Sequence, residues 1–592
     1  MTGKTKIFWA IAMQIGIVLV CSYLFSTSVH GAELPIKLRG SDFQGGAQKQ
    51  FGSSFYSREG VNLIYATPTG PLSVMSASIV LDKSPTAPMV LSLEAMDDDA
   101  PQKCRVAITL NNHALWSAPS GFPDGQWQIK RFSIPDGLLK TGTNRLTITN
   151  LEPNGSAGQP PWFMIARCVL AGADYHLPVI AAAKFEVQIP DHSRAFPEPL
   201  AAGQEPGFKF RGTKGYAWTP EQYLEEIPWL VKFKMNFLMN CYVSMFTPER
   251  PWKNEWWKPL SKEKAAAYAK VIQSCQDSGI TFCFCMNPQL ACVRPLVSTN
   301  TADVDLLYEH YAWAQSLGVK WFSICVDDVG WGNKGPAQVA VEDANLVNTV
   351  VTRLRQNNPQ AQMIFCPGPY SGDGMQPDQH TYLQTLGRDL DPQVYVFWTG
   401  DGVVGQHITV KAATSYKLAV NHRLFLWDNY PVNDAAPTLS LGPVSGRDPG
   451  LDQLIDGYMG NPMATQNEAN RIPLATCADF SYNPSAYDPA RSIGQTILLL
   501  AKTPAQQRCL QELIETYPGF IVTGGNTGTN PVRDKFNSLS GKSDFTAAQQ
   551  LLHRVEKLVS QMEKDFPAQF DNAKKTVADD VAWMKQKSNG TK

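Results

Sequence analysis

From Phe208 to about Ala478 the chain repeats short apolar runs separated by longer segments of helical periodicity. The runs predict buried strands, and segments such as Thr219–Lys232 and Lys262–Asp277 predict helices. About eight such βα units predict a TIM barrel. An open doubly wound sheet is the alternative, but Gly212-Thr213-Lys214-Gly215 poorly matches the phosphate loop expected there. The predicted strands are Phe208–Gly212, Asn236–Tyr242, Thr281–Met286, Trp321–Asp328, Met363–Tyr370, Val394–Gly400, Leu424–Tyr430 and an eighth near Met463–Ala469.

Two other patterns flank this region. Residues 32–175 alternate apolar and polar positions, as at Cys104–Asn111, and turn residues interrupt them at short intervals. This predicts a β-sandwich of jelly-roll type, and Gly142–Ile148 resembles galactose-binding-like domains. Residues 176–206, rich in Ala and Pro, predict a linker before the barrel domain, 207–480. Helical periodicity in 481–592 predicts a C-terminal helical domain, so the fold class is multidomain α/β.

The first 31 residues have the pattern of a secretory signal peptide. Lys4 and Lys6 precede an apolar run, and small residues follow it before Ala32. The expected location is therefore secreted or periplasmic. A membrane is an expected partner only if this segment stays uncleaved.

The composition limits which partners and cofactors we expect. Lys plus Arg (52) nearly balance Asp plus Glu (53), so no basic field favours nucleic acid. Five of the cysteines lie in apolar runs and are expected to be buried and to act as small hydrophobic residues. The sequence does not decide whether Cys104 and Cys168 form a disulfide. No metal-ligand spacing is visible, and we expect neither a metal nor another cofactor.

Polar and aromatic side chains stand where the predicted strands end, which is where TIM barrels build active sites. The strand Trp321–Asp328 ends in Asp327 and Asp328, and another ends in Tyr370. Near the ends of the predicted strands Val394–Gly400 and Leu424–Tyr430 lie Trp398 with Thr399 and Trp427, respectively. Each could instead be a helix cap or barrel core, but together they predict a sugar pocket, because aromatic faces stack on sugars and carboxylates bind hydroxyls.

These strings resemble glycoside hydrolase family 84, the O-GlcNAcases and bacterial β-N-acetylglucosaminidases. The resemblance covers the barrel, in the family's order and approximate spacing. It is carried by Phe322–Val329, Phe365–Tyr370, Trp398–Gly400 with Val403-Val404, Trp427–Asp434, Leu441–Pro443 with Gly446-Arg447, and Gly460–Pro462.

The resemblance implies removal of terminal β-linked N-acetylglucosamine from a glycan or glycoconjugate, with retention and with the substrate's acetamido oxygen as nucleophile. It implies that Asp327 polarises the acetamido N–H, that Asp328 is the general acid/base, and that Tyr370 holds the acetamido oxygen. Trp427 and Trp398 would wall the pocket. The remaining implied substrate contacts are Gly212, Thr399, Val403, Asn429, Asp434 and Asn461.

The chain departs from the family pattern at two places, and these differences leave two alternative functions open. The family's first strand ends Glu-Gly-Phe-Tyr-Gly, where this chain has Arg211–Gly215. Its second strand carries a lysine for sugar hydroxyls, where this chain has Val243; Lys214 or Arg250 would have to replace it. The alternatives are a hydrolase of another 2-acetamido sugar and a secreted glycan-binding protein with an inactive barrel.

Overall fold

The computed structural model describes residues 34–47, 54–55, 58–97, 103–123, 127–155, 161–177, 185–247, 252–434, 436–523, 527–541 and 545–589. Contacts divide the chain into two compact units, residues 1–48 with 60–178 and residues 49–59 with 179–592. The predicted signal peptide and Arg250 lie outside the described residues. None of the helices in these ranges is long and apolar enough to cross a membrane.

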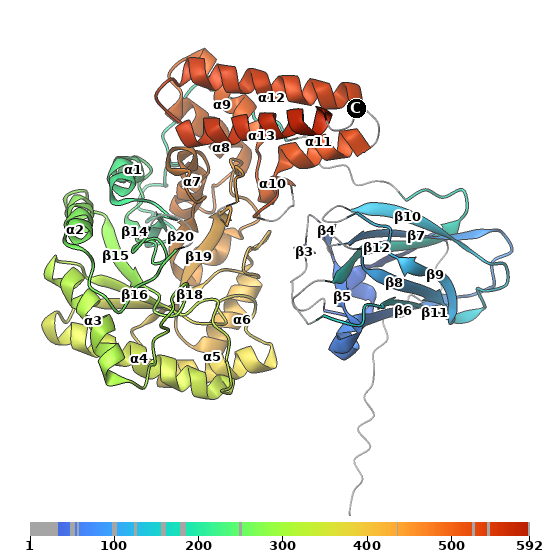
Figure 1. The fold of residues 1–592 in the computed structure, drawn as a ribbon, viewed down its shortest axis with the longest axis horizontal. Coiled ribbons are helices and arrows are strands. Elements are labelled where there is room, and N and C mark those ends of the chain that lie inside the picture. Colours follow the sequence, from blue (N-terminus) through green and yellow to red (C-terminus); the bar gives the residue numbers. More distant parts are fainter. Residues whose placement is uncertain are drawn as a thin grey trace, which may run out of the picture. The chain divides into compact units, whose positions relative to one another are not determined.

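The first unit contains two antiparallel sheets, which confirms the predicted β-sandwich (Figure 1). Strand β6 alternates half-buried and buried positions, as a strand with one face on a core does. Cys104 and Cys168 are both buried free thiols. One sheet holds β1 (Ile36–Arg39), β5 (Asn62–Tyr65), β7 (Met89–Asp97), β10 (Gln128–Ile134) and β12 (Trp162–Gly172), and the other β2 (Gln44–Gly45), β6 (Val74–Leu81), β8 (Arg105–Leu110), β9 (His113–Pro119) and β11 (Gly142–Asn150). Two 3₁₀ helices, η1 (Gly40–Asp42) and η3 (Thr67–Ser73), complete it.

The second unit is built on a closed barrel of parallel strands, which confirms the predicted TIM barrel. In barrel order the strands are β13 (Phe210–Lys214), β14 (Phe237–Met239), β15 (Thr281–Met286), β16 (Trp321–Cys325), β17 (Gln362–Cys366), β18 (Tyr395–Trp398), β19 (Arg423–Pro431) and β20 (Ile455–Asn461). A separate short pair, β3 (Ser54–Phe55) and β4 (Arg58–Glu59), also falls in this unit.

The prediction of an eighth strand near Met463–Ala469 is wrong. The eighth strand is β20, and that segment runs into the following helix. Its glycines hid it from the sequence pattern, because glycine weakens strands. The barrel nevertheless requires one of them: a Cβ on Gly457 would lie 2.3 Å from the Phe425 ring.

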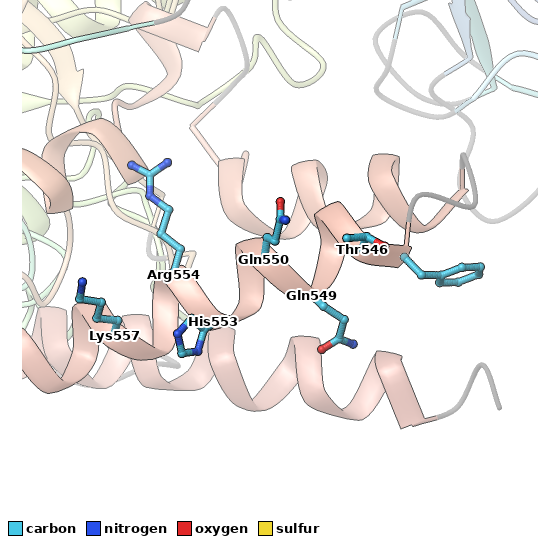
Figure 2. A pocket seen from close by; sticks show the side chains of 7 residues that line it. Thr546, Gln549, Gln550, His553, Arg554 and Lys557 are labelled. Atoms are coloured by element: carbon cyan, nitrogen blue, oxygen red, sulfur yellow. The ribbon is translucent and has the colours of Figure 1, made fainter.

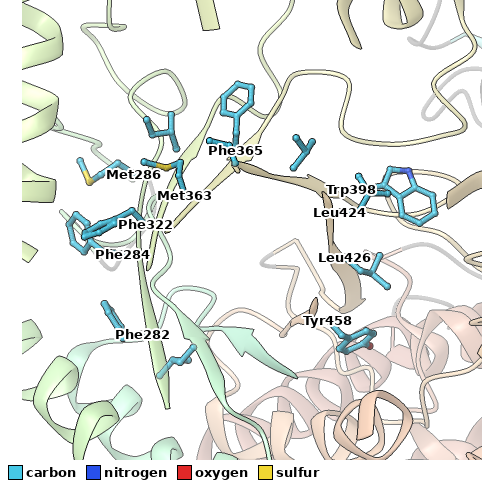
Figure 3. Packing of buried hydrophobic residues seen from close by; sticks show 14 of the residues in the cluster. Phe282, Phe284, Met286, Phe322, Met363, Phe365, Trp398, Leu424, Leu426 and Tyr458 are labelled. Carbon is cyan, nitrogen blue, oxygen red and sulfur yellow. The ribbon is translucent and has the colours of Figure 1, made fainter. Parts of the chain in front are cut away.

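Alternate side chains of each barrel strand face opposite ways. The outer side chains fill the layer between the strands and the surrounding helices, and Figure 3 shows ten of them by name, including Phe284, Met363 and Trp398. The inner side chains form a separate cluster that includes Cys285, Phe397 and Trp427. The covering elements are α1 (Pro220–Lys232), α2 (Lys262–Asp277), α3 (Thr301–Ser316), α4 (Pro336–Asn357), α5 (Pro377–Asp389), α6 (Val410–Val420), η4 (Pro449–Gln453) and α7 (Asn467–Tyr482).

The C-terminal helices have their own core, which α7 residues join. They are α8 (Pro489–Leu500), α9 (Pro504–Thr516), α10 (Phe520–Thr523), α11 (Pro531–Gly541), α12 (Phe545–Asp565) and α13 (Asp571–Asn589). The described part of the predicted linker, residues 176–177 and 185–206, has no helix or strand. It is bound to this helical part: the Val187 amide donates to Glu515 and the Arg194 amide to Gln495.

Candidate active site

Two adjacent carboxylates follow β16 at its carboxyl end. Asp327 is 8% exposed, whereas Asp328 is exposed. Asp328 has a φ of +61°, a left-handed conformation that aspartate tolerates better than most residues. The chain therefore turns sharply between them, and one acid lies deep in the strand ends while its neighbour faces outward.

Two neutral donors hold the Asp327 carboxylate. The Tyr242 hydroxyl donates to Oδ2, and Asn287 Nδ2 donates to Oδ1 at 2.9 Å. The Asn287 amide is fixed in this orientation, because its Oδ1 already accepts the backbone N–H groups of Gln289 and Leu290, each at 2.9 Å. Tyr242 and Asn287 follow β14 and β15, so three consecutive strand ends build the clamp.

Burial decides the electrostatics of this clamp. It raises the pKa of Asp327 to about 7, although the Tyr242 hydrogen bond and the Lys214 charge oppose the shift. Burial also holds the pKa of the Tyr242 phenol well above its usual range, so it stays a donor at neutral pH. Asp327 can therefore exchange its proton near neutrality, as groups at reactive sites often do.

Lys214 ends β13 inside the same group of side chains. It is 4% exposed, and its Nζ lies 4.1 Å from the centroid of the Trp427 ring and 5.0 Å from that of Tyr242. Trp427 in turn packs edge-on against Phe397 at 5.2 Å. An ammonium thus lies on the aromatic wall that faces the carboxylates, and its contact with the rings is a cation–π interaction.

Tyr370 connects the exposed acid to the loops after β17 and β18. Its hydroxyl donates to Asp328 Oδ1 at 2.6 Å, and its carbonyl accepts the Thr399 amide at 2.9 Å. The Thr399 hydroxyl donates to Gly402 O at 3.0 Å. Thr399 is buried and therefore fixes this loop, which holds Tyr370 against the acid.

The amide residues predicted from the resemblance form a chain at the ends of β19 and β20. Asn461 donates to Asn429 Oδ1 at 2.8 Å, and Asn429 donates to Val403 O at 2.6 Å. The Asn461 Oδ1 is buried and has no hydrogen-bond partner among the described residues. Asp434, in a nearby loop, accepts the Thr527 hydroxyl. Their substrate contacts stay predictions.

Two predicted pocket residues, Trp398 and Gly212, have packing roles, and the sugar contact of Gly212 stays a prediction. Trp398 points out of the barrel: it is fully buried against Tyr416, and its Nε1 donates to Gly372 O at 2.8 Å (Figure 3). The expectation that Trp398 walls the pocket is therefore corrected, because strand alternation gives the inward position to Phe397. At Gly212, a Cβ would lie 1.7 Å from Phe237 O, so close strand packing alone requires glycine there.

Another buried aspartate, Asp428, lies on β19 next to the inward-facing Trp427 and therefore on the outer side of the barrel wall. Arg447 donates to both oxygens of Asp428, at 2.9 and 2.6 Å, and the Tyr458 hydroxyl donates to it at 2.7 Å. The side chains of this ion pair are both 1% exposed. Sequence patterns did not reveal this pairing or the contacts of Tyr242 and Asn287. Asp428 and Arg447 stood only in strings of the family resemblance, and Tyr242 and Asn287 only behind apolar runs.

Two hollows of the described surface lie away from these strand ends. One of about 770 Å³ runs along α12 and is lined by Phe545, His553, Arg554 and neighbours on that helix (Figure 2). Another of about 130 Å³ lies beside Trp257 and His310. Neither is lined by a pair of carboxylates, so the candidate active site stays at the ends of the barrel strands.

The barrel interior also assembles a potential metal-ligand group that residue spacing did not reveal. Ligand atoms of Cys325, Asp327 and Cys366 lie within 4.8 Å of one another. The residues come from two adjacent strands and the segment after one of them, so only the folded chain brings them together.

A TIM barrel whose strand ends combine a carboxylate pair with tyrosine, tryptophan and amides defines a class of protein, the barrel glycosidases. Residues 211–515 match the family described as beta-N-acetylglucosaminidase. The match covers more than half of the chain, and the chain belongs to this family, glycoside hydrolase family 84.

Individual relatives agree with this assignment. The protein O-GlcNAcase of Mus musculus is 26% identical over 275 residues, which cover 45% of this chain and 29% of the mouse protein. The Rattus norvegicus protein matches to the same extent. A solved Thermobaculum terrenum O-GlcNAc hydrolase mutant shares the fold, with a TM-score of 0.52 and 22% identity, covering 64% of this chain and 83% of that one. The chain thus spans under a third of the length of its mammalian relatives.

Proposed function

We propose that the chain is a retaining exo-glycosidase that removes terminal β-linked N-acetylglucosamine by substrate-assisted catalysis. The observation that carries this proposal is the difference between two adjacent acids. Asp327 is buried and clamped, and Asp328 is exposed. A terminal sugar that enters the barrel mouth would place its acetamido group beside the deep acid and its leaving group beside the outer one.

This placement gives each acid one task. Asp327 accepts the acetamido N–H and so strengthens the acetamido oxygen as a nucleophile. That oxygen bonds to the anomeric carbon, the glycosidic C–O bond breaks, and Asp328 gives its proton to the leaving oxygen. Asp328 then takes a proton from the water that opens the oxazoline. Two inversions at one carbon retain the configuration, and no enzyme nucleophile is needed.

The remaining groups bind the sugar. Trp427 offers an aromatic wall, and Tyr370 has its hydroxyl 2.6 Å from the acid that meets the leaving group. Lys214 supplies a buried ammonium for ring hydroxyls, in place of the family lysine whose position Val243 takes. Because that cation comes from another strand, a hydrolase of a different 2-acetamido sugar is the second candidate.

The test is turnover of 4-nitrophenyl β-N-acetylglucosaminide by the purified chain, beside the matching N-acetylgalactosaminide and glucoside. We expect the N-acetylglucosaminide to react fastest, the glucoside to be inert for lack of the acetamido group, and the first product to be the β-anomer by NMR. Preference for the galacto compound supports the second candidate. Binding of N-acetylglucosamine without turnover of any substrate would establish an inactive, glycan-binding barrel. Secretion, expected from residues 1–31, belongs to the same proposal.

A further inference from the structure

Three thiols converge inside the barrel directly beneath Asp327. Cys285, Cys325 and Cys366 belong to three consecutive strands, β15, β16 and β17, and each is at most 1% exposed. The Sγ atoms of Cys285 and Cys325 are 3.4 Å apart, and Cys325 pairs directly with Cys366 across the parallel strands. The Cys325 and Cys366 sulfurs and an Asp327 oxygen lie within 4.8 Å of one another.

These spacings are close to those of a soft-metal site. Zinc takes thiolate sulfur at about 2.3 Å and carboxylate oxygen at about 2.0–2.2 Å in a tetrahedron, which puts neighbouring ligands roughly 3.4–3.8 Å apart. Cys325, Asp327 and Cys366, whose ligand atoms all lie within 4.8 Å of one another, therefore need only small side-chain movements, whereas Cys285, with its Sγ 3.4 Å from that of Cys325, must also turn toward the other two. A mixed set of three sulfurs and one oxygen favours zinc or cadmium over magnesium or calcium.

We propose that Cys285, Cys325, Cys366 and Asp327 form an inhibitory binding site for zinc and similar soft divalent ions at the floor of the active site. The ion reaches it past Asp327, the most exposed of the four residues. Each thiol releases its proton to solvent when its sulfur binds. Lys214, which interacts electrostatically with both Cys325 and Asp327, offsets part of the negative charge of the ligands.

Binding has one consequence for the proposed reaction. An ion that holds an Asp327 oxygen displaces a hydrogen bond from Tyr242 or Asn287 and removes the carboxylate from the acetamido group. The metal is thus an inhibitor, and catalysis itself needs none. Only this inhibition rests on the proposed function; the binding of the ion does not.

The binding experiment uses cadmium chloride and the reduced full chain. We expect the ultraviolet charge-transfer band of cadmium–thiolate bonds to saturate at one ion per chain. Cys325→Ser and Cys366→Ser should each weaken binding more than about a hundredfold, since even an outer-shell change costs about 10–100-fold. Cys283→Ser is the matched control, because Cys283 is also buried in the interior of β15 but belongs neither to the group of Cys325, Asp327 and Cys366 nor to the proposed ligand set. Circular dichroism checks that each variant folds.

The inhibition experiment uses zinc chloride and the chromogenic substrate. We expect zinc to abolish turnover, a chelator to restore it, and Cys366→Ser to resist zinc while keeping its activity. Absence of the cadmium band in the wild-type chain, or its persistence in both ligand variants, overturns the site. A band without loss of turnover overturns the inhibition. Recovery with a reductant but not with a chelator would show thiol oxidation instead and also overturn the proposal. If the chain turns over no substrate at all, the cadmium experiment still decides the site.

Discussion

Two buried aspartates at strand ends of the same barrel are stabilised in opposite ways. Asp428, on β19, receives two hydrogen bonds from the Arg447 guanidinium and one from Tyr458. Asp327, after β16, receives its hydrogen bonds from a phenol and an amide. A buried carboxylate that is paired with a full positive charge has a structural role. A buried carboxylate that receives its hydrogen bonds from neutral groups has a pKa that can still change with its surroundings. This difference supports the proposed role of Asp327 in the reaction.

Because the pKa of Asp327 is raised, the contribution of this residue to the free energy of unfolding depends on pH. Burial raises it to about 7 from an ordinary value near 4. Between these values the folded state holds a proton that the unfolded state has released. Stability therefore falls as pH rises through this window, by linkage, and is lowest above about pH 7.

The largest expected effect separates the two acids of the pair. Asp328→Ala should slow a substrate with a poor leaving group by about 10²–10⁴-fold, the usual contribution of general acid catalysis. It should slow oxazoline formation from a nitrophenyl glycoside much less, because an activated phenol leaves without a proton. Asp327→Ala should slow both substrates alike, since the acetamido group needs help whatever departs. Single-turnover rates for a nitrophenyl and an alkyl glycoside measure this.

The result also locates the active site. Equal leaving-group dependence in the two variants would contradict the assigned roles. Full activity in both variants would place the active site elsewhere in the chain.

The next effect concerns stability at the two carboxylates. Asp428→Asn leaves the Arg447 charge buried without its partner and should lower the free energy of unfolding by about 3–5 kcal/mol. Asp327→Asn should not lower it at pH 8, because it removes a buried charge that receives hydrogen bonds only from neutral groups and that Lys214 offsets only in part. The new amide can still accept from Asn287 and donate to the Tyr242 oxygen. Urea unfolding of both variants at pH 5 and pH 8 tests this; the advantage of Asp327→Asn should appear only at pH 8.

Sequence patterns predicted the layout of the barrel, and tertiary packing decided what they missed. Apolar runs revealed seven strands, but β20 carries two glycines, one of which, Gly457, the ring of Phe425 requires. The carboxylate pair was visible because it ends an apolar run. The clamp was not: Tyr242 and Asn287 meet Asp327 from 85 and 40 residues away. Trp398 was misassigned because the inward or outward direction of a strand residue depends on a register that a four-residue strand does not reveal.

A smaller effect tests Lys214 as the sugar's cation. Lys214→Met keeps most of the side-chain volume and removes the charge. A hydrogen bond to a charged group contributes about 1.5–3 kcal/mol, so KM should rise roughly 10–100-fold with little change in kcat. The kinetics should be measured well above pH 7, because the Lys214 charge also lowers the pKa of Asp327.

The control for Lys214 lies at the other end of the same strand. Lys209 precedes β13, is exposed, and has its Nζ 5.4 Å from the Phe210 ring. Lys209→Met should leave KM unchanged. An unchanged KM in Lys214→Met as well would mean that the pocket binds hydroxyls through other groups.

The smallest expected effect concerns Tyr242, whose hydroxyl lowers the pKa of Asp327. Because Asp327 must be ionised to accept the acetamido N–H, kcat/KM should fall as pH drops below about 7. Tyr242→Phe removes a hydrogen-bond donor to the ionised form of Asp327. The acidic limb of the pH profile of kcat/KM should therefore move to higher pH by about one unit, since one pKa unit equals 1.36 kcal/mol. Tyr458→Phe removes the equivalent phenol from Asp428 and should leave the limb in place, because Asp428 has no part in the proposed reaction and the Tyr458 hydroxyl hydrogen-bonds to Asp428 rather than to Asp327. A limb that stays fixed in Tyr242→Phe, or moves equally in both variants, would assign the titration to a group other than Asp327.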